Sequence, residues 1–343
     1  MNLYLFPQAA NNLNGYSIAV DAGYKACNPS AEDVVVWYTT YPKDKMWYLR
    51  ESDFIINRPR GLTLRRVYNV LTRKNSCQPS VSDLSFLEGK QFDTIHCDDV
   101  LFYPAIRKMF PNSKITVKFH NCFARILDRL NLVDIPVTMR YRVALRNMYH
   151  VERSAMRDNN VYKIFISDED RNYYTSHFGK TSDSEVFSFS PSLNTVQNKR
   201  NRPLHFDHKL IWFGGVEAHK TASIQWFIEK VLPKLKEDIK DIEFHLWGSR
   251  TEQFDSPEKG IYGHGFYNGE GLPSETSLYV NPDIIGGGVK IKLLTNFEKG
   301  IPFITSPYGF EGYSYELVDN KYCTVAEEDN WVSVVLDMLR KYA

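Results

Sequence analysis

The sequence lacks the features that mark several classes of protein. Its five cysteines are widely spaced and form no Cys-x-x-Cys pair, which argues against a disulfide framework or a zinc knuckle and favours a reducing compartment. No stretch approaches the ~18 consecutive apolar residues of a membrane-spanning helix. The amino terminus has no basic segment followed by a long apolar run, and solenoid-length repeats are missing. We therefore expect a cytosolic protein.

The sequence also has no excess of positive or negative charge. The 42 Lys and Arg residues nearly balance the 41 Asp and Glu residues, so the net charge of +1 argues against nucleic acid as a partner. At roughly 150 residues per domain, 343 residues suggest two domains, and a hydrophobic content of 43% supplies the core for them.

Short apolar runs alternate with helical patterns along most of the chain. Such alternation predicts an α/β protein with mostly parallel sheets covered on both faces. A polar stretch rich in Ser, Asn and Pro interrupts the rhythm before a second α/β unit begins at Lys209. We expect an N-terminal Rossmann-like domain over 1–190, a linker over 191–207 and a C-terminal Rossmann-like domain over 208–343.

The most informative stretch is 281–312, NPDIIGGGVKIKLLTNFEKGIPFITSPYGFEG. An apolar strand at 278–280 leads into three glycines, and a helix is predicted from near Val289 to a C-cap at Gly300. Glycines let a ligand approach the backbone, and the N–H groups of a first helical turn suit an anion. Lys290 and Lys292 add positive charge. Because residues two apart diverge on a helix, we expect only Lys290 to reach the anion.

The order N-P, G-G-G-V-K-I-K-L-L, G-I-P and Y-G-F-E-G resembles the donor-binding segment of GT-B glycosyltransferases. The likeness is strongest to the large retaining family that includes many bacterial polysaccharide-assembly enzymes. Further matches follow in order at 211–215, 221–235, 243–249 and 263–266, with looser ones at 152–157 and 161–167. The resemblance implies two Rossmann-like domains facing across a cleft, and transfer of a sugar from a nucleotide-sugar donor.

The resemblance also implies roles for particular residues of the C-terminal half. The glycine loop would hold the diphosphate, with Lys220 and Lys290 assisting as catalytic cations. In the family a glutamate stands at the positions of Thr295 and Gly287, and the hydroxyl of Thr295 would bind a ribose more weakly than a carboxylate. The expected donor-binding residues are Gly15, Gly214, Gly215, His264, Gly265, Phe266, Gly286, Gly287, Gly288, Val289, Thr295 and Glu311.

In the N-terminal half, His120 ends the predicted strand 115–119 and matches the family histidine that contacts the donor sugar. We expect it to act as a neutral hydrogen-bond donor and catalytic residue, with a purely structural histidine as the alternative. His96, Asp98 and Asn121 are acceptor-side candidates. For Asp98, and for its neighbour Asp99, helix capping is the favoured alternative.

The region 105–157 is rich in basic residues, with apolar residues interleaved. Such a face predicts peripheral contact with an anionic inner membrane surface, and a solvated helix face over the core is the alternative. The basic positions are 107, 108, 114, 118, 125, 129, 140, 142, 146, 153 and 157. The apolar ones are 110, 119, 123, 127, 130, 139, 141, 145 and 148.

Together these patterns predict a retaining glycosyltransferase that adds a sugar to a saccharide or lipid-pyrophosphate-linked acceptor in surface polysaccharide synthesis. We expect no cofactor and no catalytic metal, because the Asp168-Glu169-Asp170 run after the predicted strand 163–167 is better interpreted as a helix N-terminus favoured by the helix dipole. Two alternatives remain open at this point. One is a catalytically silent GT-B binding subunit, and the other is an inverting transferase with His96 or Asp98 as base.

Overall fold

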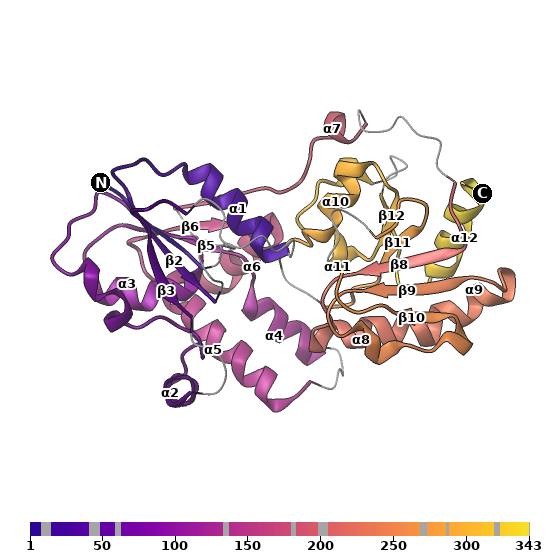
Figure 1. The fold of residues 1–343 in the computed structure, drawn as a ribbon, viewed down its shortest axis with the longest axis horizontal. Coiled ribbons are helices and arrows are strands. Elements are labelled where there is room, and N and C mark those ends of the chain that lie inside the picture. The colour runs from indigo at the N-terminus through magenta and orange to yellow at the C-terminus, as the bar shows by residue number, and fades with distance from the viewer. Residues whose placement is uncertain are drawn as a thin grey trace. The chain divides into compact units, whose positions relative to one another are not determined.

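A computed structural model gives the fold (Figure 1). It describes residues 1–7, 15–40, 49–58, 63–132, 137–179, 183–197, 205–267, 273–285, 288–318 and 323–342. The chain divides into two compact units. The first comprises 1–131 and 138–187, and the second comprises 132–137 and 188–343.

The first unit is built on a parallel sheet of seven strands in the order β3-β2-β1-β4-β5-β6-β7. The strands are β1 (Leu3–Phe6), β2 (Val34–Thr39), β3 (Phe54–Asn57), β4 (Ile95–Cys97), β5 (Ile115–Phe119), β6 (Val161–Phe165) and β7 (Ser184–Val186). Its helices are α1 (Gly15–Cys27), α2 (Leu64–Leu71), α3 (Tyr103–Met109), α4 (Phe123–Leu132), α5 (Met139–Met156) and α6 (Asp168–Phe178). Strands buried on both faces explain the near-continuous apolar runs, as in β2, where Val35 to Tyr38 are fully covered.

The start of α6 shows how local sequence positions a helix. Ser167 accepts a hydrogen bond from the Asp170 N–H, and three acidic residues occupy the first turn, where the helix dipole favours them. The run Asp168-Glu169-Asp170 is therefore a helix start, as the sequence predicts.

The second unit has six parallel strands in the order β10-β9-β8-β11-β12-β13. They are β8 (Lys209–Phe213), β9 (Glu243–Trp247), β10 (Ile261–Gly263), β11 (Leu278–Asn281), β12 (Phe303–Thr305) and β13 (Cys323–Val325). The helices are α7 (Leu193–Gln197), α8 (Ala218–Trp226), α9 (Leu232–Asp238), α10 (Lys292–Lys299), α11 (Pro307–Phe310) and α12 (Trp331–Lys341). A π-helical turn, Phe227–Val231, joins α8 to α9, and Phe227 packs edge-on against Trp331 in the core.

Helix α10 starts later than the sequence predicts. Gly288 takes a positive φ of 69°, which an L side chain rarely adopts, and the chain turns again before Lys292 begins the helix. The predicted end is confirmed, because Gly300 caps the helix in the left-handed conformation.

Both sheets share one topological feature. Chain order reverses beside the first strand of each unit, between β1 and β4 and between β8 and β11. In open α/β sheets, ligands bind outside the carboxyl ends of the strands at such a switch point. The predicted class, α/β with two Rossmann-like domains, is confirmed. Within the described ranges no helix combines the length and apolar character needed to cross a bilayer.

Candidate functional site

The loops after β8 and β9 pass each other at very close range in the second unit. A Cβ on Gly248 would lie 1.9 Å from the Gly214 carbonyl oxygen, and Gly248 has a φ of 135°. The Gly214 N–H donates to the Trp247 carbonyl at 2.9 Å, and the Val216 N–H donates to the Ser249 carbonyl at 3.0 Å. A Cβ on Gly215 would lie 3.0 Å from the Ser249 hydroxyl oxygen. The predicted donor-binding glycines 214 and 215 therefore lie in a loop that packs closely against, and is hydrogen-bonded to, the loop after β9.

The loop after β11 is fixed by side chains from several elements. The Ser223 hydroxyl on α8 accepts the Ile284 N–H at 3.1 Å. Ser306, the N-cap of α11, donates its hydroxyl proton to the Asp283 carbonyl. A Cβ on Gly309 would collide with Thr305 and Asn281, so the glycine of the Y-G-F-E-G motif allows α11 to pack against the strand ends.

Three lysines gather at the β8/β11 switch point. Lys292 lies inside, with Nζ 3.7 Å from the buried Asp283 carboxylate and 4.8 Å from the centre of the Trp212 ring. The pKa of Lys292 is lowered to about 8, chiefly by burial and also by the charges of Lys220 and Lys290, while Asp283 acts in the opposite direction. The cluster therefore carries more positive charge than Asp283 neutralises.

The structure corrects the reasoning that set Lys292 aside. That reasoning assumed that Lys290 and Lys292 both lie on a helix, but Lys290 precedes α10 and Lys292 is its first residue. Two residues in different backbone conformations are free to point to one region. The Lys290 Nζ donates to the Gly288 carbonyl at 3.1 Å, and the Lys220 Nζ lies 3.8 Å from a Glu217 carboxylate oxygen.

The glycine loop itself is only partly described. Gly286 and Gly287 lie outside the described residues. Gly288 and Val289 are buried and Lys290 is half-buried. The Tyr313 hydroxyl donates to the Lys290 carbonyl at 2.9 Å and holds this end of the loop in place. Anion contact by the N–H groups of Gly287, Gly288 and Val289 stays a prediction.

The 263–266 segment forms an aromatic edge beside β9. The ring of His264 stacks on Trp247 with centroids 4.0 Å apart, and its Nε2 lies 2.8 Å from Nδ1 of His245. The Gly265 N–H donates to Thr251, and its carbonyl accepts from Gly248, so the backbone of Gly265 is already engaged. Phe266 is 69% exposed and offers a ring for stacking.

Two further predicted donor contacts lie on α10 and after α11. Thr295 is half-buried on α10. Glu311 is the half-buried residue that follows α11, in an extended conformation. The donor-binding roles of both residues remain predictions.

At the switch point of the first unit, three side chains surround the carboxylate of the predicted residue Asp98, and two of them, His96 and His120, are also predicted site residues. Asp98 is fully buried, and its Oδ1 lies 3.3 Å from Lys118 Nζ while its Oδ2 lies 3.1 Å from His120 Nε2. His96 Nε2 is 3.9 Å from Oδ1. Burial alone would raise the pKa of Asp98, but Lys118 and His120 outweigh it and hold that pKa well below its ordinary range.

This arrangement fixes the orientation of His120. Its Nε2 faces two acceptors, the Asp98 carboxylate and the Asp98 carbonyl, so Nε2 carries the proton in the neutral ring. Nδ1 then becomes an acceptor, and among the described residues it has no hydrogen-bond partner. Tyr16 packs edge-on against the His120 ring at 5.3 Å.

The surroundings of His120 come from the ends of neighbouring strands. The Tyr16 hydroxyl donates to Asp99 at 2.6 Å, and Asp99 also caps the turn at Val100–Phe102, so the capping alternative is confirmed for Asp99. Gly15 is the first residue of α1, and the half-buried Asn121 lies between His120 and α4.

The N-terminus of α4, two residues after Asn121, already holds a carboxylate. Buried Glu152 of α5 accepts the Phe123 N–H at 3.1 Å and the Ala124 N–H at 3.3 Å. Burial raises the pKa of Glu152 to about 8. Sequence reasoning did not single out Glu152, Lys118 or Asp283, because each owes its position to a partner distant in the chain.

The predicted basic face over 105–157 is divided by the fold. Of its apolar members, Phe119, Leu130, Leu145 and Met148 are buried in the core, whereas Met139 is 72% exposed. Three of its cations pair internally: Arg107 with Asp158, Lys118 with Asp98 and Arg125 with Asp170. Burial of these four residues agrees with the alternative, a helix face over the core, and membrane contact by the basic face stays a prediction.

No family model matches the sequence, and neither does any curated protein. Solved structures do match. WaaG, a glycosyltransferase involved in lipopolysaccharide biosynthesis, aligns over 99% of this chain and 90% of its own, with a TM-score of 0.62 and 12% identity. Sucrose-phosphate synthase from Thermosynechococcus elongatus aligns over the same shares, with a TM-score of 0.65 and 12% identity. The chain has the GT-B fold.

A third GT-B structure, HepE from Anabaena in complex with UDP, aligns over 99% of this chain and 90% of its own, with a TM-score of 0.55 and 12% identity. Identities this low establish the fold and leave the activity to be argued from the site. In the part of the chain that the structure describes, no group of three or more His, Cys, Asp or Glu side chains is placed to hold a metal ion.

Proposed function

We propose that this chain is a glycosyltransferase that moves a sugar from a nucleotide-sugar donor to a saccharide or lipid-linked saccharide in surface polysaccharide synthesis. The observation that carries the proposal is the cluster of Lys220, Lys290 and Lys292 at the β8/β11 switch point of a GT-B fold. The UDP complex of HepE and the role of WaaG in lipopolysaccharide biosynthesis support the choice of donor and pathway class.

The lysine cluster supplies what sugar transfer requires. Negative charge grows on the departing diphosphate, and cations already in place stabilise it without rearrangement during the reaction. An isolated cation is costly to bury, and the lowered pKa of Lys292 reflects that cost. A bound diphosphate would offset it. Phe266 and His264 would contact the base, and Thr295 a ribose hydroxyl.

His120 would bind the donor sugar from the first unit. Because Asp98 holds the proton on Nε2, the ring presents Nδ1 and would accept a hydrogen bond from a sugar hydroxyl, the reverse of the donor role that the sequence suggested. The same geometry argues against Asp98 as the base of the inverting alternative. Asp98 is fully buried, paired with Lys118 and held at a low pKa, so it is a poor base.

We propose a retaining reaction that uses no metal or other cofactor. The expected partners are the nucleotide sugar and a lipid-pyrophosphate-linked or oligosaccharide acceptor at the inner face of a membrane, with no nucleic acid. Lysines would neutralise the leaving diphosphate, a task that Mg²⁺ performs in other phosphate-transferring sites.

Thermal unfolding with UDP, GDP and CMP, and with their sugars, tests the donor site. We expect one nucleotide to raise the melting temperature, and a smaller rise in Lys220→Ala. If no nucleotide raises the melting temperature, the proposal is refuted.

Turnover then separates the remaining alternatives. With the stabilising donor, His120→Ala should lower kcat, and proton NMR of the product should show a retained anomeric configuration. Equal, negligible turnover by wild type and His120→Ala, with donor binding intact, would instead identify a silent binding subunit.

A further inference from the structure

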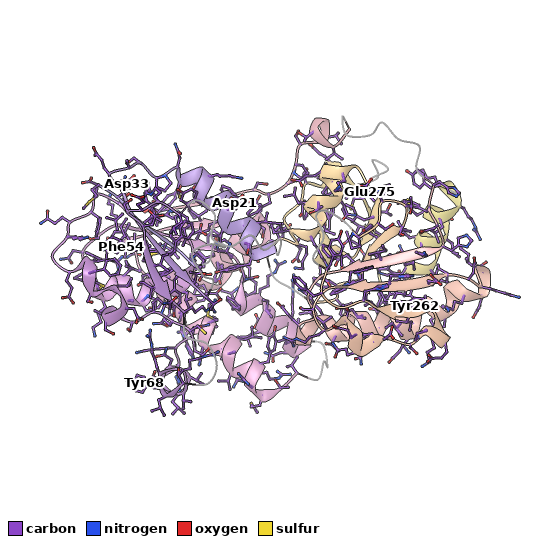
Figure 2. All side chains as sticks on the ribbon, in the orientation of Figure 1. Asp21, Asp33, Phe54, Tyr68, Tyr262 and Glu275 are labelled. Atoms are coloured by element: carbon purple, nitrogen blue, oxygen red, sulfur yellow. The ribbon has the colours of Figure 1, made fainter. Side chains whose placement is uncertain are left out.

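Helix α2 turns a complete apolar face to solvent. Leu64 is 91% exposed, Val67 40%, Tyr68 61% and Leu71 77%. These positions follow the i, i+3, i+4, i+7 spacing, so they form one stripe on one side of the helix. Surface helices normally turn such a stripe to the core, yet these four side chains are exposed, and Tyr68 lies at the margin of the first unit in Figure 2.

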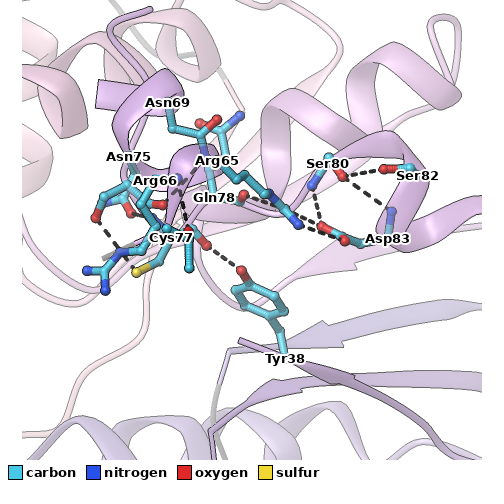
Figure 3. A network of polar contacts seen from close by, with 12 residues as sticks. Tyr38, Arg65, Arg66, Asn69, Asn75, Cys77, Gln78, Ser80, Ser82 and Asp83 are labelled. Carbon is cyan, nitrogen blue, oxygen red and sulfur yellow. Dashed lines mark hydrogen bonds and ion pairs between the residues drawn. The ribbon is translucent and has the colours of Figure 1, made fainter. Parts of the chain in front are cut away.

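The outward face is fixed by polar contacts on the opposite side of α2. Thr63 caps the helix start, and Arg65 pairs with Asp83, with Nη1 and Oδ1 2.9 Å apart (Figure 3). At the other end, the Asn147 amide of α5 donates to the carbonyls of Val70 and Lys74 at 3.2 and 3.0 Å. These contacts fix the orientation of α2, so the fold itself holds the apolar stripe toward solvent.

Positive charge lies at the C-terminal end of the stripe. The sequence over 58–75 contains no acidic residue and six basic ones, of which Arg65 pairs with Asp83 on the other side of α2. Arg73 and Lys74 are exposed at the end of α2, where Lys74 Nζ lies 5.6 Å from the centre of the Tyr68 ring. The apolar stripe and the cations thus form one continuous surface.

The positive surface continues onto α5. Burial lowers the pKa of His150, and the charges of Arg73 and Arg153 lower it further, so the end of α2 and this part of α5 lie close together. His150, Arg153, Ser154, Arg157 and Asp158 line an open hollow of about 450 Å³. The one acid there, Asp158, pairs with Arg107 Nε at 2.6 Å, so the hollow remains positive.

We propose that α2 is a membrane anchor, whose apolar stripe inserts into an anionic phospholipid bilayer while the surrounding cations bind lipid phosphates. An amphipathic helix with cations beside its apolar face is suited to the lipid interface. Charge complementarity selects this occupant. A second copy would bring two sets of cations together, and nucleic acid would leave the four apolar side chains uncovered.

This inference deepens the proposed function by naming the surface that would hold the enzyme beside a lipid-linked acceptor. Only the biological reason for an anchor rests on the proposed function. The test of membrane binding uses neither a sugar donor nor an acceptor. Its failure would therefore leave the transferase proposal standing, and a failure to bind nucleotide would leave the anchor standing.

The test is flotation of the full chain with vesicles of phosphatidylcholine alone and of phosphatidylcholine with phosphatidylglycerol. We expect binding to the anionic vesicles that weakens as salt rises, because salt screens the charges. Leu64→Ser with Leu71→Ser should lower the partition coefficient at least tenfold. Arg73→Glu with Lys74→Glu should lower it at least tenfold on anionic vesicles and remove the preference for them.

Matched controls come from the second unit. Tyr315 is 68% exposed, and Lys234 and Lys240 are exposed cations, so Tyr315→Ser and Lys234→Glu with Lys240→Glu repeat the same chemistry elsewhere. Both controls should bind as wild type does. All changed side chains are at the surface, so circular dichroism should show every variant folded.

Three results would overturn the anchor. One is equal recovery of wild type with and without anionic vesicles. Another is equal loss of binding in the α2 variants and their controls. The third is a wild-type dimer in size-exclusion chromatography that Leu64→Ser with Leu71→Ser dissociates, because α2 would then be covered by a second copy. A probe on Leu71→Cys that enters an apolar environment only with anionic vesicles would support the anchor independently.

Discussion

The two sheets share their strand order around the first strand but differ in the chemistry at the switch point. In the first unit, Asp98 is matched by Lys118 and His120, and the His120 Nδ1 has no hydrogen-bond partner among the described residues. In the second unit, three cations, Lys220, Lys290 and Lys292, lie near two carboxylates, the buried Asp283 and the exposed Glu217. Under the proposed function, one topology would position two kinds of ligand, a neutral hydroxyl and an anion. The residues at the strand ends decide which.

The largest effect is expected from removing the carboxylate at the centre of the first unit's cluster. Asp98→Ala would leave Lys118 buried without its partner, and breaking a buried pair in this way costs about 3–5 kcal/mol of unfolding free energy. Urea denaturation measures this. Asp241→Ala, at an exposed aspartate paired with His208, is the control and should change stability little. A loss below about 1 kcal/mol at Asp98 would show that the cluster is not what holds the site together.

A second prediction concerns the carboxylate at the start of α4. The pKa of Glu152 is raised from 4.5 to about 8, so the folded state binds its proton more tightly than the unfolded state. This contribution to stability is present below pH 4.5 and is lost as pH rises through about 8, with a slope of up to about 1.4 kcal/mol per pH unit.

Glu152→Gln should flatten that part of the stability profile, because an amide stays neutral. Denaturant unfolding from pH 5 to 9 gives the comparison. Parallel curves for the two proteins would mean that Glu152 titrates normally in the fold.

The third prediction tests the open cluster of the second unit. Lys292→Met should weaken binding of the nucleoside diphosphate identified by thermal unfolding at least tenfold, which is about 1.4 kcal/mol. Lys299→Met is the matched control on the same helix, because Lys299 lies at the surface and pairs with Glu275. Calorimetric titration measures both. Equal affinities would place the anion away from the switch point.

The smallest expected effect is the pH dependence of that binding. The pKa of Lys292 is lowered to about 8, and an anion binds the protonated form better, so affinity should fall severalfold as pH rises from 7 to 9. In Lys292→Met the same range should give a flatter profile. A steeper fall in the variant would assign the titration to another group.

Sequence patterns predicted much of the fold because its signals are local. Alternating apolar runs and helical segments indicate parallel strands, and helix ends are marked by Gly300 through its backbone freedom and by the acidic run 168–170 through the helix dipole. The start of α10 was misplaced because the conformation of Gly288 depends on its surroundings.

The site was harder to predict, since its partners are distant in sequence. Lys118 reads as a surface cation until β4 and β5 pair and bring Asp98 beside it. The outward face of α2 had a readable signal, apolar residues at helical spacing within an acid-free basic segment. That pattern looks the same as one facing the core, and only the exposure of Leu64 and Leu71 distinguishes the two.

The contact between Gly214 and Gly248 sets a limit for engineering. A methyl group at 248 would lie 1.9 Å from the Gly214 carbonyl oxygen, so even the smallest substitution would push the two turns apart. Alanine scanning would thus report position 248 as indispensable whether or not it touches the donor. Libraries aimed at a new donor preference should keep both glycines and vary the exposed Phe266 instead.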